Sequence, residues 1–298
     1  MLEKRTDLAL EAKELWQESA GKTTRLSGVR AKKTKQEGYS ITKVEILNDR
    51  GVEALGKPVG RYLTVDLSPF AKRQEGFFDR AVRVVGTQLK SLLPLRGAVL
   101  VVGLGNRAMT PDAVGPLAVE SVLVTRHLIS ALPRHFADFR PVAALTPGVL
   151  AATGVESAEA VAAMVRELQP AAVIAVDALA ARRVGRVCAT VQLSDTGIAP
   201  GSGVGNHRKA LDEETLGVPV IAVGVPTVVD AATIAADLLE ESGAAEVDAD
   251  RLRKDATPMM VTPRDIDQSV RELAKVVGYG INWALQDLEI EEMTALLT

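Results

Sequence analysis

The sequence predicts an α/β fold: a three-layer α/β/α sandwich in which helices cover both faces of a mostly parallel sheet. From residue 44 onward, short apolar runs alternate with helix-like segments. Runs such as "AVLVVG" (98–103) and "AAVIAV" (171–176) are apolar without alternation, which is typical of strands buried on both faces. Hydrophobic residues make up 47% of the 298 residues, enough for a substantial core, and we expect a single domain over residues 8–298.

The elements are expected in an alternating order. The strands are "VEIL", "RYLTVDL", "AVLVVG", "PVAAL", "AAVIAV", "VCATVQL" and "VPVIAVG", and the helices lie near 78–93, 113–131, 158–168, 228–241 and 265–286. Residues 1 to about 40 are polar, and "RAKKTKQEG" (30–38) predicts a solvated arm or hairpin. The stretch 241–258 is expected to be a surface link before the C-terminal helix.

Composition excludes several classes of protein. The chain has 35 Lys and Arg against 38 Asp and Glu, so no global field draws it to nucleic acid or to an acidic membrane. The single Cys188 rules out an intramolecular disulfide, and the charged start "MLEKRTDLALEAK" differs from a secretory signal. Apolar runs stop short of the roughly 20 residues that a bilayer requires. These features predict a cytoplasmic protein.

Aspartates follow three of the expected strands. Asp112 comes soon after "AVLVVG", Asp177 directly follows "AAVIAV", and Thr227 and Asp230 follow "VPVIAVG". Ligands of open α/β sheets collect at the carboxyl edge of the strands. If the carboxyls of Asp112 and Asp177 meet there, a shared proton would let them activate water for attack on a carbonyl, or both could hold a metal ion.

Each aspartate also has a structural interpretation. Thr110 can cap a helix in which Pro111 is the first residue, and Asp112 then complements the helix dipole. Asp177 can form an ion pair with Arg182 or Arg183, because burial raises a carboxyl pKa unless a partner stabilises the charge.

Two short motifs suggest other functions, and both are weak. Gly103, Gly105 and Ala108 fit the dinucleotide fingerprint, but prolines flank Asp112 where the fingerprint expects an uninterrupted helix. The "DTG" at 195–197 is the tripeptide of pepsin-like proteases, whose β-rich architecture disagrees with the helices expected here, so we interpret it as a turn.

The loop "GIAPGSGVGNHRKAL" (197–211) is a candidate substrate or regulatory surface, because successive glycines let backbone N–H groups approach a ligand. A flexible connection is the alternative. Its candidate residues, with one from the earlier glycine turn, are Gly201, Ser202, Gly203, Gly205 and Asn106. The three histidines (His127, His135, His207) do not have the spacing of a metal-binding pair. Cys188 lies in an expected strand and is interpreted as a buried apolar residue and not as a nucleophile. Ser202 lacks the glycine two residues earlier that a nucleophile elbow requires.

Several long motifs in order resemble the germination protease family of endospore-forming bacteria. They are "VVGLGNRAMTPDAVGP", "RPVAALTPGVLAATGVES", "VIAVDALAARRVGRV", "VQLSDTGIAPGSGVGNHRKAL" and "ETLGVPVIAVGVPTVVDAATIA", and the resemblance covers about residues 5–286. It implies an endopeptidase of the spore core that cleaves small acid-soluble spore proteins during germination, with a fold similar to the hydrogenase maturation endopeptidases. The family's two essential aspartates map onto Asp112 and Asp177.

The resemblance also implies a self-processing zymogen and a homotetramer. Family members cut themselves at a site similar to that of their substrates: Thr-Glu, an apolar residue, Ala, a variable residue and Glu. Residues 6–11, Thr-Asp-Leu-Ala-Leu-Glu, match that pattern, so we expect residues 1–7 to be a propeptide cut between Asp7 and Leu8.

The chain departs from the pattern of its relatives in two places. The maturation endopeptidases hold a metal with two carboxylates and a histidine, and no histidine stands in "GVPTVVDA", so we expect no metal and no other cofactor. The link before "MMVTPRDID" is also shorter than in the family, which affects expectations about subunit contacts. A metal-dependent maturation-type protease and a non-catalytic binding module are the alternative functions.

Overall fold

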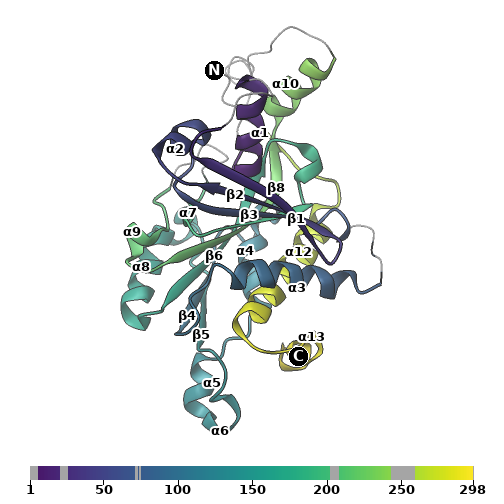
Figure 1. Ribbon diagram of the computed structural model, residues 1–298. Helices are drawn as coiled ribbons and strands as arrows, with labels where there is room; N and C mark the ends of the chain where they lie inside the picture. Colours follow the sequence, from purple (N-terminus) through teal and green to yellow (C-terminus); the bar gives the residue numbers. More distant parts are fainter. Residues whose placement is uncertain are drawn as a thin grey trace.

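A computed structural model describes residues 6–20, 26–70, 73, 75–201, 208–242 and 259–297. Within them, one nine-stranded sheet runs through the molecule with helices on both faces (Figure 1). This arrangement confirms the predicted α/β class. The candidate residues Ser202, Gly203 and Gly205, most of the 241–258 link and residues 1–5 lie outside the described part.

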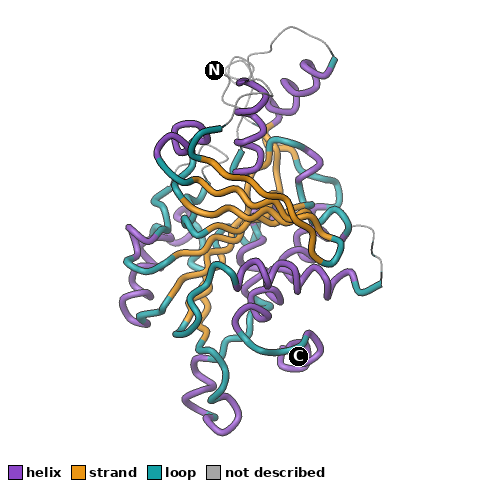
Figure 2. Tube along the Cα trace, in the orientation of Figure 1, coloured by secondary structure: helices purple, strands orange, loops and turns teal. Residues whose placement is uncertain are grey.

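The strand order is β1-β2-β3-β7-β8-β6-β4-β5, and β9 pairs with β8 off this path. The strands are β1 (Val29–Gln36), β2 (Tyr39–Ile46), β3 (Gly60–Asp66), β4 (Val99–Gly103), β5 (Val142–Leu145), β6 (Ala172–Ala181), β7 (Thr190–Ser194), β8 (Val220–Asp230) and β9 (Met260–Val261). Strands β5, β4, β6 and β8 are parallel, while β7, β3, β2 and β1 extend the sheet antiparallel. Figure 2 shows the strands forming one continuous layer.

Helices form the two outer layers. One layer holds α3 (Phe77–Lys90), α4 (Val114–Val119) and α12 (Ile266–Leu285), and the other holds α1 (Ala9–Ala20), α8 (Ser157–Leu168) and α9 (Glu213–Leu216). The remaining helices are α2 (Asp49–Leu55), α5 (Arg126–Ala131), α6 (Pro133–Phe136), α7 (Leu150–Thr153), α10 (Ala231–Glu241) and α13 (Ile290–Leu297), with short 3-10 turns η2 (Thr110–Asp112) and η3 (Val184–Arg186). Figure 1 shows α3 and α12 side by side.

The unbroken apolar pattern of β6 follows from its central place. Ile174 and Val176 pack into the core beneath α3 and α12, while Val173 and Ala175 pack into the core beneath α8. Both sets are fully buried. A strand between two helix layers has no solvated face, so alternation is lost, as predicted.

The helix expected over 113–131 is interrupted. The backbone leaves the helix after α4 because the Asn282 side chain of α12 accepts from Leu123 N–H (2.8 Å) and donates to Ser121 C=O (2.8 Å). These bonds replace the helical ladder, and α5 begins only at Arg126. A buried asparagine far away in the sequence therefore sets the end of α4.

The N-terminal region is more ordered than a solvated arm. The stretch "RAKKTKQEG" does form a hairpin with β2, and β1 is a lysine-rich, exposed edge strand. Before it, however, α1 packs Ala9, Ala12 and Trp16 onto the apolar end of β2 and β3. None of the described helices is long and apolar enough to cross a membrane.

Candidate active site

Three neighbouring strands, β4, β6 and β8, carry or precede the polar residues expected at the carboxyl edge of the sheet. Asp112 lies in η2 after β4, Asp177 lies in β6, and Thr227 lies in β8. The Thr227 hydroxyl donates to the Pro111 carbonyl (2.6 Å), which ties η2 to β8. The Leu104 N–H donates to the Val176 carbonyl (2.8 Å), which sets the turn that carries Asp112 beside the part of β6 that carries Asp177.

Asp112 is held by a tight turn and not by a helix cap. The Asn106 N–H donates to Asp112 Oδ2 (2.8 Å), and the Thr110 hydroxyl donates to Asp267 of α12 (2.7 Å) instead of capping. The interpretation of Thr110 as a cap is therefore wrong, because its hydroxyl is used by a neighbouring helix. Asn106 contacts Asp112, so its place is in the turn that orients the carboxylate.

The glycines of this stretch are required by close packing. Gly105 has φ +105°, and an added Cβ would lie 2.1 Å from the Asp112 carbonyl oxygen. At Gly115 a Cβ would lie 2.3 Å from the Leu104 carbonyl oxygen and 2.5 Å from that of Val176. The resemblance to a cofactor loop arises because both structures need a turn with close backbone contact.

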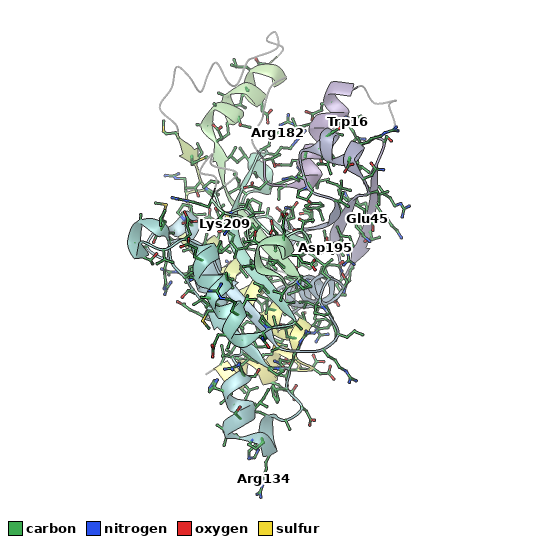
Figure 3. All side chains as sticks on the ribbon, turned by 90° about the vertical axis from the view of Figure 1, so that its left-hand side faces the viewer. Trp16, Glu45, Arg134, Arg182, Asp195 and Lys209 are labelled. Carbon is green, nitrogen blue, oxygen red and sulfur yellow. The ribbon has the colours of Figure 1, made fainter. Side chains whose placement is uncertain are left out.

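Asp177 is buried on β6 and lacks the cationic partner considered for it. Its side chain is 5% exposed, and its Oδ1 accepts from the Ala178 N–H (2.9 Å). Arg182 instead pairs with Glu18 of α1 (2.8 Å) and Asp237 of α10 (3.0 Å), and Arg183 pairs with Glu18. Figure 3 shows Arg182 where α1 and α10 approach each other. The interpretation of Asp177 as half of a structural ion pair with these arginines is wrong.

The surroundings of Asp177 raise its pKa well above its usual range. Burial is the main cause of the raised pKa, and the negative charge of Asp112 adds to it. The Ala178 N–H opposes them, and the negative charge of Asp7 makes a further, lesser contribution to the rise. Burial also raises the pKa of Asp112, opposed by the Asn106 N–H. Of the two, Asp177 is the more deeply buried and retains a proton more readily. A carboxylic acid beside a carboxylate can serve as general acid and general base.

The segment around Asp7 is bonded to β6 three residues beyond Asp177. The Asp7 N–H donates to the Ala180 carbonyl of β6 (3.0 Å), and Asp7 Oδ2 accepts from the Ala180 N–H (2.8 Å). The side chain of Gln192 on β7 bonds the backbone on both sides of Leu8. Its amide nitrogen donates to the Asp7 carbonyl (3.0 Å), and its amide oxygen accepts from the Ala9 N–H (2.8 Å). The bond between Asp7 and Leu8 is therefore docked against β6 and β7.

The side chains after Asp7 are bound individually. Leu8 is fully buried among Leu179, Val187 and Val229. The carboxylate of Glu11, also fully buried, accepts from the N–H groups of Arg182 (2.7 Å) and Arg183 (3.0 Å) and lies 3.0 Å from Arg186 Nη1. The Thr6 hydroxyl donates to the same carboxylate (2.5 Å).

Sequence reasoning missed Gln192 and the docking of α1 on residues 182–186. Gln192 stands inside the apolar run "ATVQLS", where a polar residue is a signal of a buried hydrogen bond. Helix α1 carries acidic residues at helical spacing, namely Glu11, Glu14 and Glu18, and they face the basic segment "RRVGR" at 182–186. This complementary charge is a sequence signal for the docking of α1 on that segment.

The other predicted residues have structural surroundings. Gly201 has φ +74° in a turn beyond the bridge between Ile198 and Leu211. Asp195 of the "DTG" follows β7 and pairs with Arg61 (2.6 Å), in agreement with a turn. Cys188 lies before β7 and not within a strand, and burial raises its pKa to about 12. Across the described residues, no group of three or more His, Cys, Asp or Glu is placed to hold a metal ion.

Comparison with known proteins gives a consistent result. Residues 9–242 match the family model described as germination protease. The chain is 41% identical over 322 residues to a germination protease of Clostridium perfringens and 42% identical over 321 residues to that of Caldanaerobacter subterraneus, with 98% of each chain covered in both cases. For Bacillus cytotoxicus the identity is 36% over 355 residues, covering 99% of this chain and 96% of the relative.

A solved structure is also similar. A nickel–iron hydrogenase maturation protease, HycI, from Thermococcus kodakarensis KOD1 matches 65% of this chain and 99% of its own, with 16% identity and a TM-score of 0.34. The sequence comparisons are much stronger, since they extend over nearly the whole chain. The chain therefore belongs to the germination protease family of peptidases.

Proposed function

We propose that this protein is an endopeptidase that cleaves small acid-soluble spore proteins in the spore core during germination, with Asp112 and Asp177 activating water. The observation that carries this proposal is the buried carboxyl of Asp177, whose pKa is raised by burial and by Asp112. Strongly perturbed acids with a charged neighbour are typical of catalytic sites. Membership of a peptidase family makes peptide-bond hydrolysis the matching chemistry.

The two aspartates have different roles. Asp112, the less buried and ionised member, takes a proton from water as the oxygen attacks the peptide carbon. Asp177, protonated, donates a hydrogen bond to the carbonyl oxygen and stabilises the charge that develops there. The proton held by Asp112 then passes to the leaving amine, the C–N bond breaks, and the pair returns to its initial state.

The same site accounts for a self-processing zymogen. Residues 6–11 lie against β6 and β7, and the bond between Asp7 and Leu8 is the one to be cut. Asp7 is bonded to Ala180, three residues beyond Asp177, a separation of about 10 Å along a strand. The segment therefore has to shift toward the aspartates before it is cut, which keeps the unprocessed protein silent. We also expect the homotetramer of the family, which light scattering would measure.

Two substitutions test the aspartate pair. Asp112→Asn and Asp177→Asn remove one acid each while preserving shape, and each is expected to lower cleavage of a purified acid-soluble spore protein by at least about 1,000-fold. Asp49→Asn, at an exposed helix start, is the matched control and keeps full activity. Circular dichroism verifies folding, and a chelator tests the metal-dependent alternative. Full activity of either variant at the site would eliminate the proposal.

A further inference from the structure

A polar groove lies beside α1 on the face of the sheet that carries Asp177. Its volume is about 500 Å³, and residues of β1, β2, β3, α1 and η3 line it. Several of them are hydroxyl residues, among them Thr42 and Thr64, and charged groups of both signs, such as Lys33, Glu14 and Arg186, complete the lining. This volume lies within the range of about 300–1,000 Å³ that is typical of ligand-binding pockets.

Three buried side-chain atoms of residues that line this groove have no hydrogen-bond partner within the described part of the chain: Thr64 Oγ1, Glu14 Oε2 and Arg186 Nη1. Glu14 Oε2 lies 3.8 Å from Arg183 Nε and Arg186 Nη1 lies 3.0 Å from Glu11 Oε1, so each of these two has an opposite charge nearby. Thr64 is 2% exposed, and leaving a buried hydroxyl without a partner is unfavourable. Since Thr64 lines the groove, a polar ligand bound there would satisfy its hydroxyl.

The groove is connected to Asp177 by the register of the sheet. Asp177 is the partner of Gly224 on β8, which is the partner of Gln192 on β7, and Gln192 is the partner of Thr64 on β3. The row then continues through Thr42 on β2 to Lys33 on β1. Partners in register point to the same face of a sheet. With strands about 4.8 Å apart, Thr64 lies three strands, or about 14 Å, from Asp177.

The chain's own N-terminal segment meets this row at Gln192. Asp7 is bonded to Ala180 of β6, Gln192 of β7 holds the backbone at Asp7 and Ala9, and Leu10 lines the groove. From Ala9 onward the chain turns into α1 and leaves the row. A polypeptide that replaced this segment and stayed extended would continue past Gln192 to Thr64 and Thr42.

We propose that the groove binds the substrate polypeptide on the C-terminal side of the cleaved bond. This inference rests on the proposed function and adds a subsite to it. Thr64 and Thr42 bond the main chain of the substrate, which makes binding tolerant of sequence. Lys33, with Lys32 and Lys13 on the same lining, favours an acidic side chain at the far end.

The test compares two peptides and two variants of the full-length protein. One peptide has the sequence of residues 6–11 and reaches the groove only at Leu10, and the other has that of residues 6–17 and is long enough to continue along it. Thr64→Val removes only the buried hydroxyl. Thr34→Val, on β1 but on the opposite face from Lys33, is the control. With the long peptide, Thr64→Val is expected to raise KM about 5–10-fold without changing kcat. With the short peptide, Thr64→Val should leave both KM and kcat unchanged. Thr34→Val should leave both constants unchanged for either peptide.

Equal effects of Thr64→Val on both peptides, or no effect on either, would overturn the inference. A binding measurement separates this failure from failure of the proposed function. In the Asp177→Asn background, which does not cleave, fluorescence anisotropy should show the labelled long peptide binding more tightly than the short one, and Thr64→Val should remove that difference. Equal affinities for the two peptides would refute the groove even if the wild-type protein cleaves both.

Discussion

The buried carboxyl of Asp177 has a raised pKa because it lies in the core near the negative charge of Asp112. The two residues reach this position from different strands, and neither is neutralised by the arginines that follow Asp177 in the sequence. Such an arrangement costs stability and is retained where it serves chemistry. The first predictions concern this pair.

The rate of cleavage should show a bell-shaped dependence on pH. Activity needs an ionised Asp112 and a protonated Asp177, so it is lost in acid as Asp112 gains a proton and in alkali as Asp177 loses one. Both pKa values are raised, which shifts the bell toward higher pH than for free carboxyls. Because the two carboxyls interact, the apparent pKa values of the acid and alkaline limbs describe the pair and not the individual residues. Measurement of kcat/KM against pH checks the shape, and an acid limb near that of a free aspartate would contradict it.

Removal of the Asp7 charge should move the alkaline limb. Asp7 raises the pKa of Asp177, so that pKa falls when Asp7 is replaced or released by processing. Asp7→Asn keeps an oxygen for the Ala180 N–H and should lose activity at a lower pH than the unprocessed wild type. The pH profile of single-turnover self-cleavage gives the comparison, and Asp49→Asn is the control. Superimposable profiles would show that Asp7 is not electrostatically coupled.

Asp177→Asn should stabilise the protein at neutral pH. A carboxyl whose pKa is raised by folding contributes full stability below its unfolded pKa, and that contribution is lost as pH rises toward the folded value. An amide avoids this loss and keeps the bond from the Ala178 N–H. We expect a rise in Tm of a few degrees, or about 1 kcal/mol, at pH 7, and no gain at pH 3. Calorimetry at both pH values measures it, and a lower Tm at pH 7 would contradict the prediction.

Gly105→Ala should impair both folding and cleavage. The new methyl group would meet the Asp112 carbonyl at 2.1 Å, and φ +105° is strained for alanine. We expect a loss of at least about 2 kcal/mol and a displaced carboxylate. Gly154 also has a positive φ, +72°, but a Cβ added there would meet no other atom. Gly154→Ala therefore measures the cost of the backbone conformation without the contact with Asp112. Urea unfolding and kcat compare the two, and equal effects would exclude the contact with Asp112 as the cause.

Self-processing should yield a chain that begins at Leu8, and it should depend on Glu11. The Glu11 carboxylate holds the segment through two backbone N–H groups and Arg186, so Glu11→Gln should weaken docking by roughly 2–3 kcal/mol and slow processing. Glu18→Gln, at a partly exposed ion pair, should change stability by less than about 1 kcal/mol. Intact mass spectrometry over time follows the reaction. A stable product with another N-terminus would remove the assignment of the cut.

Local sequence was sufficient for the fold class, and unbroken apolar runs identify β4 and β6. Asp112 follows β4 as expected, but the expectation that Asp177 follows its strand is wrong, because β6 continues to Ala181. The later part of β6 pairs with β8, a contact that local sequence does not reveal. The same reasoning failed for Thr110 and for Arg182, since their partners, Asp267 and Glu18, are about 160 residues away in the chain. A hydroxyl or a guanidinium accepts whichever partner folding brings near.

The sequence by itself determined which strands are buried and where the aspartates stand along the chain, because apolar periodicity and glycine turns are local properties. Only the tertiary structure decided that Asp7 lies against Ala180 and that Gln192 and Thr64 continue the row from Asp177. Strand order and register bring these residues together, and both depend on how the whole sheet packs between its helices.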